Sequence, residues 1–319
     1  YDEDRWPSGC AGGLVTAAND TFKARWLVMR PAALAEIGTL LSDPDVVALF
    51  RLVLDDEGRL IDTERIQSPS QLDGQYAADP RVSYWQFRME FQNPTTNSNG
   101  HGYIDVLNPE AVAEFIRVTH EQYYQHVGGH FGSTIPGVFA DEPTYRSKAE
   151  DSIPWSPLLP GYFRSEHGCD LIDHLPLLFF EGGCSAKIRY SFYRTLTKAF
   201  VSCFTKQIYD WCEGRGLQFT GHYLSEDTLV KQTNAIGAAM PHYRYMHAPG
   251  IDHLGNNIAD SLTLKQCASV GNQFGRKRLL CEIFGVSGHA MTFEDQKWIA
   301  NFHFALGITF LSQHLVLYS

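Results

Sequence analysis

The chain has 319 residues, of which 44% are hydrophobic, 13% aromatic and 19% charged. This composition excludes a disordered, collagen-like or coiled-coil protein and indicates a globular protein with a sizeable core. The 26 basic against 36 acidic residues give a formal net charge of −10, which argues against nucleic acid as a partner because a phosphate backbone requires clustered positive charge.

Cysteine usage and hydropathy indicate the setting in which the chain works. The seven cysteines are odd in number and include no Cys-x-x-Cys pair, so they predict neither a disulfide scaffold nor a zinc site. Free thiols suit a reducing compartment, and we expect a cytoplasmic rather than a secreted protein. The most apolar stretch, 304–318, is interrupted by Gln313 and His314 and is too short to span a bilayer, so we expect no membrane partner.

The first 99 residues do not follow the regular alternation of strand and helix patterns found later in the chain. Residues 1–19 are interpreted as the end of an early strand and its loop, and the start inside a structured motif predicts a fragment of a longer chain. Residues 45–54 and 82–91 are β-prone, and the acidic, glycine-containing segment 55–58 is typical of a hairpin turn. We therefore predict a β-rich insertion over residues 20–99.

From residue 100 onward, predicted strands alternate with predicted helices. A helix is expected after Asn108, with Pro109 at its first position. The strands are predicted at 103–107, 135–140, 217–223, 245–251, 279–284 and 308–317. Further helices are predicted at 186–213, 263–272 and 293–304. This alternation predicts a parallel sheet flanked by helices.

Several predicted strands end in polar residues, namely Asp105, Glu142, Glu226, Asp252, Glu282 and His314. In a (β/α)8 barrel the carboxyl ends of the strands converge on the active site. A doubly wound sheet is the alternative, but no Gly-x-Gly-x-x-Gly follows a strand and there is no P-loop. We predict a (β/α)8 TIM-type barrel that is incomplete at its N-terminus, with residues 100–319 forming its remainder.

Two of these carboxylates suggest a specific chemistry. Glu142, in Asp141-Glu142-Pro143, and Glu282, in Cys281-Glu282-Ile283, are each interpreted as lying at the end of an apolar strand. A carboxylate in such a place costs free energy unless it is partnered or functional. If these strands are the fourth and seventh of a barrel, the two groups flank one bond across its mouth. Glycoside hydrolysis requires such a pair. A structural role for each residue, as a helix cap or an arginine partner, is the alternative.

Other polar and aromatic residues beside the strand ends are candidates for binding a sugar. The carboxylates and imidazoles would bind hydroxyl groups, and the aromatic rings would stack on the sugar. Acidic residues at the start of a helix and aromatic residues in a core are the structural alternatives. The candidates for substrate binding are Trp6, Asp105, Asp141, Tyr145, His222, Tyr223, Glu226, Asp252 and His253.

Five segments together resemble the glycoside hydrolases related to the family 106 α-L-rhamnosidases: 2–9, 102–112, 135–143, 221–226 and 249–254. The resemblance implies a (β/α)8 catalytic domain in a longer protein with β-sandwich domains, and a terminal α-L-rhamnose or related sugar as substrate. It also implies an inverting mechanism assisted by calcium, with Glu142 as general acid and Glu282 as general base. No organic cofactor is expected, and the resemblance assigns no calcium ligands in this chain.

Three other functions remain open at the level of sequence. The first is a retaining β-glycosidase with Glu282 as nucleophile, although Asp141 stands where that clan has Asn before the Glu-Pro. The second is a carbohydrate-binding barrel without catalysis. The third is a metal-dependent hydrolase, for which His242, His247 and His253 form the nearest cluster of the thirteen histidines, although no His-x-His or His-Glu-x-x-His motif is present.

Overall fold

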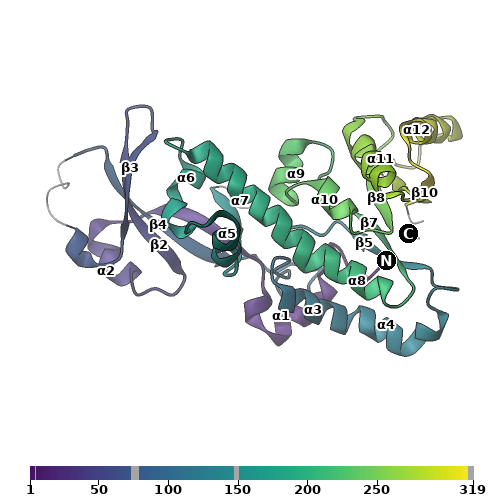
Figure 1. Ribbon diagram of the computed structural model, residues 1–319, viewed down its shortest axis with the longest axis horizontal. Coiled ribbons are helices and arrows are strands. Elements are labelled where there is room, and N and C mark those ends of the chain that lie inside the picture. The colour runs from purple at the N-terminus through teal and green to yellow at the C-terminus, as the bar shows by residue number, and fades with distance from the viewer. Residues whose placement is uncertain (4, 73–78, 147–150, 315–319) are drawn as a thin grey trace. The chain divides into compact units, whose positions relative to one another are not determined.

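The computed structural model describes residues 1–3, 5–72, 79–146 and 151–314 (Figure 1). They belong to two compact units. One, here called the parallel-sheet unit, comprises Tyr1–Phe22, Pro94–Arg146 and Phe200–Ser319. The other, the antiparallel-sheet unit, comprises Lys23–Asn93 and Ser147–Ala199. Each unit therefore combines segments that are far apart in the sequence.

The antiparallel-sheet unit is built on five strands in the order β3-β2-β4-β1-β6. Their bounds are β1 Arg25–Pro31, β2 Val46–Leu54, β3 Leu60–Ile66, β4 Val82–Phe91 and β6 Ser152–Trp155. The predicted hairpin turn is confirmed between β2 and β3, where the Asp55 carboxylate accepts the backbone N–H groups of Glu57 and Arg59 at 3.0 and 2.8 Å. Pairing of β1 with β6 brings residues after 150 into the same sheet as residues 25–31.

Helices complete this unit. They are the short α2 Ile37–Leu40, then α5 Leu159–His167, α6 Pro176–Phe179 and α7 Ser185–Phe200. Ile37, Leu49 and Ile66 form a buried hydrophobic cluster between α2 and the sheet. The helix predicted over 186–213 is divided, because a π-helical segment, Val201–Thr205, separates α7 from α8 Lys206–Glu213.

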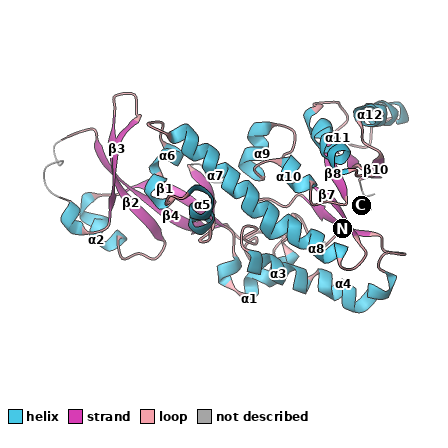
Figure 2. Ribbon diagram, in the orientation of Figure 1, coloured by secondary structure: helices cyan, strands magenta, loops and turns pink. Residues whose placement is uncertain are grey.

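The parallel-sheet unit contains five strands in the order β10-β9-β8-β7-β5, each parallel to its neighbours (Figure 2). They are β5 Gly137–Asp141, β7 Gln218–His222, β8 Ala248–Leu254, β9 Leu280–Gly285 and β10 Phe310–Gln313. Phe219, Ile251 and Ile283 are fully buried, as expected for strands covered on both faces. Strands therefore form at or near the predicted segments 135–140, 217–223, 245–251, 279–284 and 308–317, of which residues 315–317 lie outside the described residues.

Helices connect these parallel strands and precede β5. Those before β5 are α1 Leu14–Ala18, α3 Pro109–Val118 and α4 His120–Val127. Those that follow β7 are α9 Leu229–Ala235, α10 Ala239–Tyr243, α11 Leu262–Phe274 and α12 Phe293–Leu306. In the part of the chain that the structure describes, no helix is long and apolar enough to cross a membrane.

The prediction of a (β/α)8 TIM-type barrel is wrong. The described residues form an open parallel sheet of five strands and a separate antiparallel sheet, and no pairing among them joins β10 to β5. Strand and helix alternation depends on local patterns, whereas closure depends on how many strands pair and in what order, which local patterns do not encode. As a result, Glu142 and Glu282 do not face each other across a barrel mouth; β7 and β8 lie between their strands.

The predicted strand over 103–107 is also wrong. These residues form a buried loop in which the Asp105 carboxylate accepts the Leu107 N–H at 3.0 Å. Their apolar side chains are buried although the backbone of the loop does not pair in a β-ladder. The predicted start of the following helix is confirmed, because the Asn108 side chain accepts the Glu110 N–H and Pro109 opens α3.

Candidate functional site

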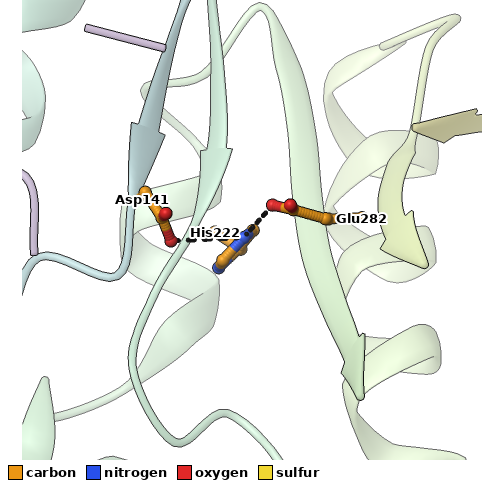
Figure 3. Close-up of side chains that lie close together, drawn as sticks. All are labelled: Asp141, His222 and Glu282. Carbon is orange, nitrogen blue, oxygen red and sulfur yellow. Dashed lines mark hydrogen bonds and ion pairs between the residues drawn. The ribbon is translucent and has the colours of Figure 1, made fainter. Parts of the chain in front are cut away.

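His222 stands at the centre of a cluster of carboxylates at the carboxyl ends of β5, β7, β8 and β9. Its Nε2 lies 2.8 Å from Glu282 Oε2 and 3.7 Å from Asp141 Oδ1, so the ring lies between the two carboxylates (Figure 3). The strand register creates this arrangement, since Asp141 is opposite His222. In the pair formed by β8 and β9, Asp252 is opposite Glu282.

The charge of the cluster favours a protonated His222. Burial alone lowers the pKa of this imidazole, but the hydrogen bond to Glu282 and the nearby carboxylates, Asp252 among them, outweigh burial and raise the pKa to about 9. At neutral pH the ring is therefore an imidazolium that donates its Nε2–H to Glu282. A positive charge is thus fixed among the acidic side chains.

Glu282 is held as a carboxylate. Burial alone would raise its pKa, but hydrogen bonds from His222 and Tyr1 outweigh burial and lower it. The Tyr1 hydroxyl donates to Glu282 Oε1 at 2.5 Å, while the Tyr1 ring packs against Phe139 with centroids 4.7 Å apart. Two of about four lone-pair positions on the carboxylate are occupied, so Glu282 retains the capacity to accept a further proton or hydrogen bond.

The pKa of Glu142 is shifted in the opposite direction to that of Glu282. Burial, reinforced by the charges of Asp252 and Asp141, raises its pKa to about 7 against the lowering effects of His222 and Trp6. Its backbone N–H donates to the His222 carbonyl at 3.1 Å, and its φ of +49° lies in the left-handed region, just after the last residue of β5. The Trp6 indole Nε1–H donates to Glu142 Oε2 at 2.8 Å. Glu142 can therefore carry a proton near neutral pH.

Besides His253 Nε2, three buried polar atoms at the ends of β7 and β8 have no hydrogen-bond partner among the described residues. They are His222 Nδ1, Glu226 Oε2 and Asp252 Oδ1. The other oxygen of Glu226 accepts from the Tyr223 N–H at 3.0 Å and the Tyr243 hydroxyl at 2.8 Å. An unpaired buried polar group costs free energy, so these atoms are suited to bind a polar ligand or water. Burial raises the pKa of Glu226 to about 8 and of Asp252 to about 6.

Not every residue predicted for the site lies in this cluster. Asp105 binds the backbone of its own loop, and the Tyr145 hydroxyl donates to the Thr233 carbonyl at 2.8 Å. Tyr223 is 1% exposed, and its hydroxyl lies 2.7 Å from Thr205 Oγ1. His253 follows Asp252 on β8, but its ring packs edge-on against His303 with centroids 4.6 Å apart. The structure brings together Trp6, Asp141, Glu142, His222, Asp252 and Glu282, with Glu226 adjoining.

Two residues of the cluster were not among the sequence candidates. Tyr1 reaches Glu282 across 281 residues of sequence, and no local pattern could have indicated that contact. Ser8 is fully buried; its backbone N–H donates to the Asp141 carbonyl at 2.8 Å and its Oγ accepts the Asp141 N–H at 2.7 Å. Both residues come from the segment before α1, which the structure places beside β5.

Two groups of side chains have the spacing of metal ligands. In each group, Asp141–His222–Glu282 and Glu142–His222–Asp252, the ligand atoms lie within 4.8 Å of one another. Calcium takes about six to eight oxygen ligands, and both groups include a buried imidazole with a raised pKa. As arranged, neither group fits calcium, and calcium stays a prediction. Among the described residues, neither group includes His242 or His247.

Comparisons with known proteins agree with this arrangement only at the level of fold. No family model and no curated protein matches the chain. A rhamnosidase from Novosphingobium sp. PP1Y has a similar solved structure, with a TM-score of 0.58 and 14% sequence identity over 93% of this chain. The match covers 36% of that rhamnosidase, so the chain spans about a third of its length. The chain therefore has a rhamnosidase-like fold, and membership of family 106 remains a prediction.

Proposed function

We propose that this chain is the catalytic part of a glycoside hydrolase that uses Glu142 as general acid and Glu282 as general base. One observation carries the proposal: two carboxyl groups each lie within 4.8 Å of the same imidazole, and their surroundings move their pKa values in opposite directions. Two such carboxyl groups, one protonated and one ionised at the working pH, are what glycoside hydrolysis requires. The rhamnosidase-like fold supports the same class.

The proposed mechanism follows from these protonation states. Glu142 gives its proton to the glycosidic oxygen as the bond between that oxygen and the anomeric carbon breaks. Glu282 accepts a proton from the water molecule that attacks the anomeric carbon. The hydrogen bonds from His222 and Tyr1 hold the Glu282 carboxylate in place during the reaction. Inversion at the anomeric carbon is part of the proposal and is inferred from the family resemblance.

A terminal α-L-rhamnose or a related sugar is the proposed substrate. The unpaired atoms of His222, Glu226 and Asp252 supply one imidazole donor and two carboxyl groups for sugar hydroxyls. Further β-sandwich domains of the same polypeptide are proposed as the chain's neighbours. The fold that the chain shares with the rhamnosidase supports the proposed substrate, and the greater length of that rhamnosidase supports the proposed further domains.

The test is hydrolysis of a panel of aryl glycosides, including an α-L-rhamnoside, by the wild-type chain and by Glu142→Gln and Glu282→Gln. Each variant should lose roughly 10²- to 10⁴-fold in turnover. The exposed helix residue Glu294 supplies a matched control, and Glu294→Gln should retain full activity. Near-normal activity in either site variant would refute the assignment. Sugar binding without turnover in the wild type would instead indicate the non-catalytic carbohydrate-binding alternative.

A metal-dependent hydrolase is the second candidate, favoured by the spacing of the two ligand groups around His222. A mixed set of imidazole and carboxylate donors suits zinc or manganese better than calcium. Metal analysis of the purified chain, followed by activity with chelator and with each cation added back, distinguishes the two candidates. One equivalent of bound zinc or manganese, with activity that is lost in chelator and restored by that cation but not by calcium, would favour the metal-dependent mechanism.

A further inference from the structure

Trp6 is an exposed aromatic side chain in direct contact with the proposed acid. Its indole N–H donates to Glu142 Oε2, yet 44% of the residue remains accessible to solvent. Covering such an exposed aromatic face with a ligand removes apolar surface from water, which is favourable. The contact with Glu142 fixes one edge of the indole and leaves the rest of the ring available.

The segment that carries Trp6 is firmly anchored to the parallel sheet. Ser8 exchanges two hydrogen bonds with the Asp141 backbone, and its Oγ donates to Asp2 Oδ1 at 2.6 Å. The Tyr103 hydroxyl donates to the Ser8 carbonyl at 2.5 Å. Asn97 Nδ2 donates to the Trp6 carbonyl at 2.8 Å. The position of the exposed ring is thus set by the sheet rather than by a mobile tail.

The position of Trp6 relative to the acid defines which part of the substrate it meets. A general acid must lie within hydrogen-bond reach of the glycosidic oxygen, and the leaving group is attached to that oxygen. A side chain that contacts the acid carboxyl from the solvent side therefore borders the leaving group. In the proposed function, the sugar that is cleaved binds instead on the side of His222, Glu226 and Asp252, whose unpaired atoms are buried.

We propose that Trp6 forms a binding site for the leaving group, in which the exposed indole face packs against a planar aglycone or the apolar face of a second sugar while its N–H positions the Glu142 carboxyl. This inference rests on the proposed function because it takes Glu142 as the acid. Aromatic rings stack well on planar or apolar faces. Trp6 is thereby both a binding residue for the leaving group and a positioning residue for the acid.

The test compares three substrates that share one sugar and differ in the leaving group: phenyl α-L-rhamnoside, methyl α-L-rhamnoside and α-L-rhamnosyl fluoride. A rhamnose disaccharide serves as a fourth substrate and distinguishes an aryl group from a second sugar. Wild type, Trp6→Ala and Trp6→Phe are measured. Trp298→Phe, at an exposed tryptophan of α12, is the matched control.

In Trp6→Ala, the KM for the phenyl glycoside should rise roughly 3- to 10-fold, since a stacking partner is lost. Fluoride hydrolysis should change less than about twofold, because fluoride has no face to stack on and needs little protonation. Trp6→Phe retains a ring but not the N–H, so it should preserve the KM for the phenyl glycoside while kcat for the methyl glycoside falls roughly tenfold. Trp298→Phe should behave as wild type.

Equal losses on all substrates in Trp6→Ala would overturn the proposal, because they would indicate only a structural role. Unchanged KM for the phenyl glycoside and the disaccharide would also overturn it. If the wild type hydrolyses none of the substrates, the proposed function fails. Calorimetric titration with the phenyl and methyl glycosides then tests the binding site at Trp6 separately. Tighter binding of the phenyl than the methyl glycoside, lost in Trp6→Ala, would support the site; no such preference would refute it.

Discussion

Glu142→Gln is expected to remove the alkaline limb of the pH profile of kcat/KM. A general acid must be protonated, so activity in the wild type should fall as pH rises through the Glu142 pKa of about 7. A general base must be ionised, so activity should also fall at low pH, below the ordinary glutamate value because the Glu282 pKa is lowered. The expected profile is a bell with its maximum on the acid side of neutrality.

The same perturbation has a measurable effect on stability. A pKa raised from 4.5 to about 7 means that the folded protein prefers the neutral form of Glu142 by about 3 kcal/mol. The folded chain then binds more protons than the unfolded chain between these pH values, so this group's contribution to stability is lost as pH rises from 4.5 to 7. The amide introduced by Glu142→Gln does not titrate, and the variant should gain up to about 3 kcal/mol over the wild type at pH 8 but not at pH 4.

Two assays examine this reasoning. Initial rates on an aryl glycoside from pH 4 to 9 give the kinetic limbs, and urea unfolding at pH 4 and 8 gives the stabilities. Trp6→Phe is an informative companion, since loss of the indole hydrogen bond should move the alkaline limb to higher pH. Persistence of the alkaline limb in Glu142→Gln would refute Glu142 as the acid. An equal stability difference at both pH values would refute burial as the cause.

Two further predictions concern the centre of the site and the sheet beneath it. His222→Gln removes the charge that lowers the Glu282 pKa, so the acid limb of the pH profile should move to higher pH by roughly 1 to 3 units. The same initial-rate measurements test this shift. An unmoved limb would contradict the assignment of Glu282 as the base. Gly221→Ala should destabilise the chain by about 2 to 4 kcal/mol in urea unfolding, because a Cβ would lie 2.0 Å from the Ala140 oxygen at a φ of +128°. Gly38→Ala, with no atom within 4 Å, is its control and should not destabilise the chain.

Local sequence patterns were sufficient for many of the secondary-structure elements. The Asn108-Pro109 pair predicted the start of α3 because a side-chain cap and a fixed φ act within one turn. A mostly apolar run predicted β9 because strands covered on both faces need nearly continuous hydrophobicity. The apolar run 103–107 gave the wrong result, since burial in a loop requires the same side chains as burial in a strand.

The candidate site was predictable as a set of residue types but not as a set of contacts. A glutamate beside an apolar strand is visible in sequence at Glu142 and Glu282. Whether its pKa rises or falls depends on partners that the sequence does not name. The indole of Trp6 and the hydroxyl of Tyr1 come from a distant segment, and each contacts a different carboxylate. Burial raises the pKa of Glu142 despite the Trp6 hydrogen bond, whereas the hydrogen bonds from His222 and Tyr1 outweigh burial and lower the pKa of Glu282.

By itself, the sequence determined a globular α/β chain with parallel strands and acidic residues near their carboxyl ends. These properties depend on composition and on periodicity over a few residues. Only the tertiary structure decided that the parallel sheet is open, that residues after 150 join an antiparallel sheet with residues 25–91, and that His222 lies between Asp141 and Glu282. Strand pairing and charge clustering depend on contacts between distant residues, whose free energies are fixed only when the whole chain is packed.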